Sequence, residues 1–237
     1  MDIVVPKHTP FSLGSSHTAF EESVQATVSD EPTAPPPVRR LPVDLPMRTR
    51  PAAEPPIPWL VLVTGLPGTG KSTVAELLAA ALGAAVLAHD WAMSGLRPYP
   101  ELQEALGRMR PSGHRVAGWS ILVALARSQI RSGRSVVLDG VARSAEIDAC
   151  RQAAQEEKAR LLVVVTSCSD AAAHRRRVES RQRRIPHWYE LEWHHVEASR
   201  ASWTAPEGAD LYLDTAEGQD AVRASLHECL AGIVAAR

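Results

Sequence analysis

The sequence contains no asparagine and only three lysines, Lys7, Lys71 and Lys158, against 23 arginines. GTP-binding switch proteins usually read guanine with an Asn-Lys-x-Asp run, and protein kinases need an asparagine for their second metal ion. The lack of asparagine therefore argues against both classes. Because arginine is the default cation of this chain, the lysine at position 71 stands out.

Cysteines are few as well, and Cys150, Cys168 and Cys229 are widely spaced. This usage is typical of reduced thiols in a cytoplasmic protein. No apolar run reaches the roughly 18 residues that a membrane-spanning helix needs, and the first residues lack the apolar stretch of a secretory signal. The formal net charge of -1 gives no general attraction to nucleic acid or to an anionic membrane. We therefore expect a cytoplasmic protein with neither partner.

Proline is unevenly distributed, because twelve of the eighteen prolines precede Trp59. The segment "EPTAPPPVRRLPVDLPMRTRPAAEPPIP" shows neither helical nor strand periodicity. Such a composition does not bury enough apolar surface to offset the entropy of the chain. The sequence therefore predicts a disordered, proline-rich tail over residues 1–56 and a folded domain over residues 57–237.

From Trp59 onward, apolar strand-like runs alternate with longer segments of helical spacing. Nearly continuous apolar strands separated by helices predict a parallel sheet covered on both faces, which is a three-layer α/β fold. Residues 91–112 contain several prolines and glycines and are predicted to form loop and short helix, with Ser112 capping the next helix. The predicted strands are residues 59–65, 84–90, 135–140, 159–167 and 209–215, and the predicted helices are residues 71–82, 114–133, 144–158, 170–183, 188–203 and 217–235.

A glycine-rich turn follows the first predicted strand and fits the phosphate-binding loop pattern G-x-x-x-x-G-K-[ST] at every required position. In this pattern backbone N–H groups surround the phosphates, and the lysine reaches the β- and γ-phosphates. The serine hydroxyl would bind Mg²⁺. The sequence thus predicts a site for ATP and Mg²⁺ formed by Gly65, Leu66, Pro67, Gly68, Thr69, Gly70, Lys71, Ser72 and Thr73, with Ser72 as a metal ligand.

The run "SVVLDG" ends the third predicted strand in Asp139. An aspartate at this place supplies the second magnesium contact of P-loop enzymes, partly through water. An aspartate that merely closes a strand is the alternative. Gly140 follows, where motor-type ATPases commonly place a water-activating glutamate. The glycine therefore argues against use of the triphosphate as fuel and favours a small phosphoryl-transfer enzyme.

From Trp59 to the C-terminus, the chain resembles the P-loop kinases of small molecules and polynucleotide ends, the group of the zeta toxins, chloramphenicol phosphotransferase and the gluconate kinases. The resemblance rests on "GLPGTGKST", on an aspartate closing the second predicted strand, on "VVLDG" and on an arginine-rich segment. It implies a five-stranded parallel sheet with an arginine-rich lid, and transfer of the γ-phosphoryl group of ATP to a hydroxyl.

Asp90, in "VLAHDWAMSG", stands where the aspartate of these kinases accepts the proton of the substrate hydroxyl. A carboxylate within hydrogen-bond reach of the nucleophile suits this chemistry, and the carboxyl ends of neighbouring parallel strands converge on one crevice. The alternative is that Asp90 only caps the helix after it. Many polynucleotide-end kinases have an arginine three residues later to hold the substrate's phosphate. Met93 stands there, which leaves Arg97 as a candidate substitute, and Trp188 is a candidate for lining the acceptor pocket.

The arginine-rich lid is predicted at about residues 177–188, within "AHRRRVESRQRRIPHWYELEW". Helical spacing predicts Arg177, Arg181 and Arg184 on one face of a helix. The resemblance implies that Arg177 and Arg181 clamp the transferring phosphoryl group. A solvated basic face is the alternative, and Arg143 is a further candidate for the same crevice.

Together these motifs predict an ATP-dependent phosphotransferase that acts on a hydroxyl of a small molecule, such as a metabolite, sugar or antibiotic. Its predicted catalytic residues are Asp90, Lys71, Arg177 and Arg181. One alternative is a nucleotide or polynucleotide 5′-hydroxyl kinase, against which the neutral charge and Met93 count. The other is a non-catalytic ATP-binding protein that uses its proline-rich tail as a partner ligand.

Overall fold

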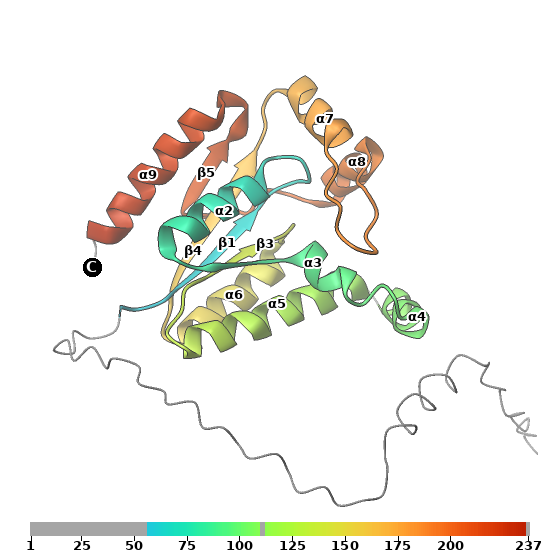
Figure 1. Cartoon of the computed structure of the whole chain (residues 1–237), viewed down its shortest axis with the longest axis horizontal. Coiled ribbons are helices and arrows are strands. Elements are labelled where there is room, and N and C mark those ends of the chain that lie inside the picture. The colour runs from blue at the N-terminus through green and yellow to red at the C-terminus, as the bar shows by residue number, and fades with distance from the viewer. Residues whose placement is uncertain (1–55, 110–111, 236–237) are drawn as a thin grey trace, which may run out of the picture. The chain divides into compact units, whose positions relative to one another are not determined.

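The computed structural model of the protein describes residues 56–109 and 112–235, with side chains up to residue 232 (Figure 1). The predicted tail lies outside these residues except for Pro56. Its disorder and its boundary with the folded domain therefore stay predictions.

Five parallel strands form one sheet in the order β2-β3-β1-β4-β5. The strands are β1 (Trp59–Thr64), β2 (Ala85–Ala88), β3 (Val136–Asp139), β4 (Arg160–Ser167) and β5 (Leu211–Asp214). The register pairs Asp139 with Val63 of β1 and with Ala88 of β2. The carboxyl ends of these three strands therefore meet at one edge of the sheet, beside the start of the phosphate loop.

Helices cover both faces of the sheet, as the sequence predicts (Figure 1). Helices α2 and α9 lie on one face, and α5 and α6 lie on the other. Among the described residues, no helix is long and apolar enough to cross a membrane. The helices are α2 (Lys71–Leu82), α3 (His89–Ser94), α4 (Pro100–Arg108), α5 (Gly113–Arg131), α6 (Ser144–Glu156), α7 (Ala171–Ser180), α8 (Trp193–Ser202) and α9 (Gln219–Ala235), with a short 3-10 turn, η1 (Thr215–Glu217).

The central strand β1 explains why its sequence is apolar throughout. Val61 and Val63 belong to the core under α2 and α9, whereas Leu60 and Leu62 belong to the core under α5 and α6. All four side chains are fully buried. Because side chains alternate between the faces of a strand, a sheet covered on both faces needs an apolar residue at every position.

The second strand is shorter than predicted, and this changes the place of Asp90. Strand β2 ends at Ala88, and Asp90 lies in the first turn of α3 rather than at the end of the strand. The next residues form two helices, α3 and α4, where loop and one short helix are predicted. Ser112 precedes α5 as predicted, but its side chain makes no capping hydrogen bond.

The arginine-rich helix is also shorter than predicted. Helix α7 ends at Ser180, Arg181 is extended, and Arg184 has a positive φ of 52°. The predicted single helix face carrying Arg177, Arg181 and Arg184 is therefore wrong. Pro186 disfavours helical backbone at Ile185 and so helps to keep the following stretch non-helical. The non-helical stretch between α7 and α8, residues 181–192, is called the lid segment below.

Candidate active site

The phosphate loop connects β1 to α2, and α7 packs directly against it. Gly68 has a φ of 84°, and a Cβ at this position would lie 2.4 Å from Cγ2 of Val178 and 3.0 Å from Cδ2 of His174. A residue with a side chain would therefore be strained in its backbone and would collide with α7. Gly68 thus allows α7, called the lid helix below, to contact the loop.

Three donors converge on the carbonyl of Leu66 inside this loop. It accepts hydrogen bonds from the Thr69 backbone N–H at 3.3 Å, from Thr69 Oγ1 at 2.8 Å and from Lys71 Nζ at 2.9 Å. Thr69 Oγ1 also lies 2.7 Å from Oγ1 of Thr166 on β4. Burial lowers the pKa of Lys71, while the charges of Asp139 and Asp90 act in the opposite direction. The loop is thus held to the sheet, with its lysine beside both predicted carboxylates.

Asp139 ends β3 and is buried close to Ser72 and Lys71. Burial raises the pKa of its carboxyl group, whereas the charge of Lys71 and a hydrogen bond from Ser72 oppose that effect. Ser72 and Asp139 together offer the oxygen ligands that Mg²⁺ prefers, and Mg²⁺ is usually held by few protein groups plus water and phosphate oxygens. Within the described part of the chain, no group of three or more His, Cys, Asp or Glu side chains is placed to hold a metal. The residues therefore fit a nucleotide-linked Mg²⁺ and not a self-contained metal site.

Gly140 lies against a tryptophan of α5. A Cβ on Gly140 would lie 2.9 Å from Cζ2 of Trp119 and 3.0 Å from Cβ of His89. Trp119 is only 4% exposed, so its ring has little room to yield. The site therefore excludes a side chain at position 140, which includes the glutamate of motor-type ATPases.

Asp90 is paired with two neighbours and does not cap its helix. Its carboxylate accepts a hydrogen bond from Arg183 and lies 3.6 Å from Nδ1 of His89, whereas Ala88 is the N-cap of α3. Burial acts to raise the pKa of Asp90, but the hydrogen bond and charge of His89 and those of Arg183 outweigh it, and the pKa is lowered. The capping alternative is therefore wrong, and the carboxylate is ionised at neutral pH.

The lid segment brings Arg183 down to this carboxylate, and in Figure 1 the connection between α7 and α8 reaches toward α3. The Arg183 side chain is 8% exposed and also donates to the Tyr189 carbonyl at 2.7 Å. Glu190 accepts hydrogen bonds from the backbone N–H groups of Arg183 and Arg184, which closes the segment into a tight turn. Arg181 points to the phosphate loop instead, with its guanidinium 3.4 Å from Oγ of Ser72.

Arg177 contacts η1, which follows one edge strand, β5, whereas Asp90 follows the other edge strand, β2. Its guanidinium donates to Oγ1 of Thr215 at 2.7 Å and to the Thr215 carbonyl at 2.9 Å. Thr215 in turn donates to the Thr69 carbonyl of the loop at 3.2 Å. A cavity of about 170 Å³ opens here, next to the first turn of α2. It is lined by Gly70, Thr73, Val74, Leu77, Arg177, Thr215, Gly218, Gln219, Val222 and Arg223.

His174 is a site residue that the sequence did not single out. It is 2% exposed, and its Nε2 lies 2.7 Å from the carbonyl of Pro67 in the phosphate loop. Because a carbonyl only accepts, Nε2 carries the proton. Trp193 of α8 packs edge-on against the ring, with centroids 5.2 Å apart. Burial lowers the pKa of His174, which favours the neutral ring. This bond joins the lid helix to the loop.

One predicted candidate, Arg143, is not brought to the crevice. Arg143 bonds to the Ser202 carbonyl and hydroxyl at the end of α8, at 3.2 and 3.0 Å. Met93 is fully buried in the core. Arg183 belonged to the arginine run but had no periodicity to distinguish it, since it acts from a non-helical turn. His174 offered one weak signal, as the only histidine of α7.

Comparison with known proteins places this site in a family. A family model described as an AAA domain matches residues 60–206, which contain the phosphate loop, Asp90, Asp139 and the lid segment. The chain belongs to the AAA domain family. A curated relative, a UPF0200 protein of Aeropyrum pernix, is 38% identical over 88 residues, which are 35% of this chain and 46% of the relative. The chain thus matches less than half of that relative's length.

Solved structures of kinases share the fold of this AAA domain protein. The APS kinase CysC of Mycobacterium tuberculosis, in complex with AMPPNP and APS, is 22% identical with a TM-score of 0.52, covering 74% of this chain and 99% of that one. A gluconokinase of Sinorhizobium meliloti is 20% identical with a TM-score of 0.53, covering 75% and 93%. The chain therefore has the nucleotide-binding P-loop kinase fold, as the resemblance in sequence implied.

Proposed function

We propose that this protein transfers the γ-phosphoryl group of ATP to a hydroxyl group of a small molecule. The observation that carries the proposal is the placement of Asp90. Its ionised carboxylate lies near enough to Lys71 for each charge to act on the other, yet on a different element from the phosphate loop. A carboxylate in this position can serve an acceptor without contacting the donor.

On the donor side, the loop N–H groups and Lys71 would hold the triphosphate of ATP. The cavity beside Thr73, Val74 and Thr215 would hold the adenine ring. Ser72 and Asp139 would hold Mg²⁺. When bound, the ion would neutralise phosphate charge and fix the phosphates in place. The structure of the fold neighbour APS kinase in complex with AMPPNP supports a nucleotide in such a site.

In the reaction, the acceptor oxygen forms a bond to the γ-phosphorus while the bond between that phosphorus and the β–γ bridging oxygen breaks. The bonding electron pair leaves with ADP, and the hydroxyl proton passes to Asp90. Arg181, which already contacts Ser72, would stabilise the charge of the transferring group. Arg177 would act from the side of the adenine ring, since its guanidinium is held by Thr215.

The test is a screen of metabolite, sugar and antibiotic alcohols incubated with the full chain, ATP and Mg²⁺. A phosphorylated product gains the mass of one phosphoryl group, and ADP forms in equal amount. A 5′-hydroxyl oligonucleotide belongs in the same screen, because its labelling in preference to the small alcohols would replace our proposal with an end kinase. ATP binding without transfer to any acceptor would favour a non-catalytic role.

A further inference from the structure

Two buried donors of the lid segment, which contacts Asp90 through Arg183, have no hydrogen-bond partner among the described residues. They are Nε of Arg183 and Nε1 of Trp188, whereas a third, Nε1 of Trp119, belongs to the packing beneath Gly140. Nε of Arg183 lies 3.7 Å from the nearer oxygen of Glu190, which is too long for a hydrogen bond. An unpaired buried donor costs about 1–3 kcal/mol. Two of them in one short segment, joined through Tyr189, indicate a site built for a group that accepts hydrogen bonds.

Arg97 adds a positive charge at the same place. Its guanidinium carbon lies 5.2 Å from the ring centre of Trp188 and 5.7 Å from that of Tyr189. Its one side-chain hydrogen bond within the described residues is a long one, 3.4 Å to Oε1 of Gln103, and no carboxylate pairs with it there. A guanidinium stacked on aromatic rings keeps its N–H edge available for a planar or tetrahedral anion.

These groups lie close together. Tyr189 stacks on Trp188, with centroids 5.2 Å apart. Burial raises the pKa of the Tyr189 hydroxyl, and the charges of Asp90, Arg183 and Arg97 all act on it as well. Residues from α3, from the turn after it and from the lid segment therefore face each other around the carboxylate of Asp90.

We propose that the acceptor alcohol also carries an anionic group, a phosphate or a carboxylate, which binds to Arg183, Arg97 and the indole N–H of Trp188. This inference rests on the proposed function and names the class of its acceptor. The anion takes Arg183 away from Asp90, and the freed carboxylate then accepts the proton of the hydroxyl. One face of Trp188 is covered by Tyr189 and its ring is also approached by Arg97, so it contributes its N–H edge rather than a stacking surface.

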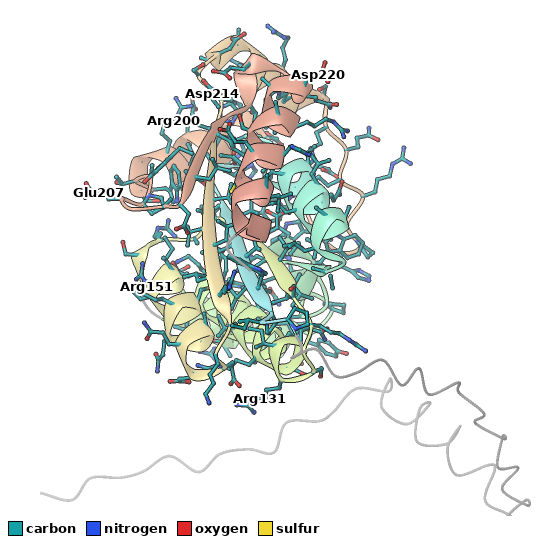
Figure 2. The ribbon with its side chains drawn as sticks, turned by 90° about the vertical axis from the view of Figure 1, so that its left-hand side faces the viewer. Arg131, Arg151, Arg200, Glu207, Asp214 and Asp220 are labelled. Carbon is teal, nitrogen blue, oxygen red and sulfur yellow. The ribbon has the colours of Figure 1, made fainter. Side chains whose placement is uncertain are left out.

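The first test measures anion binding to the full chain saturated with Mg²⁺ and AMPPNP, so that the phosphate loop is filled. The probes are inorganic phosphate and acetate, and the binding of each is measured by calorimetry. We expect Arg97→Gln and Arg183→Gln each to weaken binding at least tenfold, and Trp188→Phe to weaken it several-fold. Arg151→Gln is the matched control, because Figure 2 shows Arg151 on the outer side of α6 and, among the residues that the structure describes, its ion pair is with Asp148 alone. Binding that is absent in the unaltered chain, or equal in all variants, overturns the inference.

The second test compares alcohols that differ only in charge, namely a sugar, its sugar acid and its sugar phosphate. We expect kcat/KM to favour a charged member at least 100-fold, with the preferred member telling carboxylate from phosphate. Arg97→Gln should remove most of that preference, and its partly exposed position keeps it foldable even where Arg183→Gln is not. Equal use of the neutral sugar overturns the inference while the proposed function stands. Arginine-dependent anion binding without any transfer overturns the proposed function while the anion site stands.

Discussion

On the proposed donor side of the site, an open cavity of about 170 Å³ lies beside a loop fixed to the sheet, whereas between the phosphate loop and the lid segment the space measures only about 10 Å³. The small space, between Gly68, Arg183 and Glu190, has room for about one water. The cavity of the proposed donor side is therefore already open, whereas in our proposal the acceptor binds only when Arg183 moves away from Asp90. This difference predicts that mutations should separate cleanly into those that affect ATP binding and those that affect transfer.

The largest effect should come from the two aspartates, one on each side. Asp90→Asn keeps the shape of the side chain but removes the proton acceptor, so transfer should fall by about 10²–10⁴-fold while ATP affinity stays near that of the unaltered chain. Asp139→Asn should instead raise the Mg²⁺ concentration needed for activity. Titrations of ATP binding and of Mg²⁺-dependent turnover distinguish the two. Full turnover in Asp90→Asn, or exchanged phenotypes, would refute the assignment of roles.

Lys71→Ala should weaken ATP binding on the proposed donor side, because it removes the positively charged ammonium group that lies against the phosphate loop. We expect transfer to fall by roughly 10²–10³-fold, mostly through weaker ATP binding. Lys158→Ala is the control, since that exposed lysine follows α6 and is remote from the loop in sequence. An unchanged ATP affinity in Lys71→Ala would exclude a triphosphate in this loop.

His174 tests whether effects on ATP binding and on transfer can be separated, because it joins the lid helix to the phosphate loop. His174→Leu leaves the carbonyl of Pro67 buried without its donor, so we expect KM for ATP to rise about tenfold and thermal stability to fall. His174→Gln keeps a donor and should recover part of both. If stability falls in His174→Leu but KM for ATP does not change, the residue only packs.

The pH dependence of transfer should report the contact between Arg183 and Asp90. The charge and hydrogen bond of Arg183 help to lower the pKa of Asp90, so Arg183→Gln should raise that pKa. A base acts only when ionised, and the acidic limb of kcat/KM should therefore move to higher pH, while the plateau above it falls because Arg183 also binds the anion of the proposed acceptor. His89 also lowers this pKa, so His89→Gln should move the limb in the same direction. An unmoved limb in Arg183→Gln would mean that Asp90 is not the titrating group.

The smallest effect should come from the proline-rich segment. Its composition predicts that it adds little to a core, so deletion of residues 1–54 should leave ATP affinity and melting temperature nearly unchanged on both sides of the site. A large loss of either quantity would show that the segment packs on the domain.

The sequence predicted the donor side far better than the acceptor side. The phosphate loop is one contiguous motif, and its glycine and lysine spacing is typical of phosphate binding. The apolar run of the third strand placed Asp139 beside it. Asp90 was found, but its helix was taken for strand because β2 has only four residues. Arg183 could not be distinguished from Arg181, because the turn that aims each one depends on Glu190 accepting backbone N–H groups across the lid segment. Such contacts have no periodicity in sequence.

Gly140 has a consequence for how this protein can change over time. Glycine and glutamate codons can differ by a single base, so the glutamate that would turn such a site toward water lies close in the genetic code. The indole of Trp119 would lie 2.9 Å from the new Cβ, so this single-base change would produce a steric clash. A lineage would first have to lose a core tryptophan and accept a weaker fold before it could gain the glutamate. The packing of one ring thus keeps a water-activating glutamate out of this site.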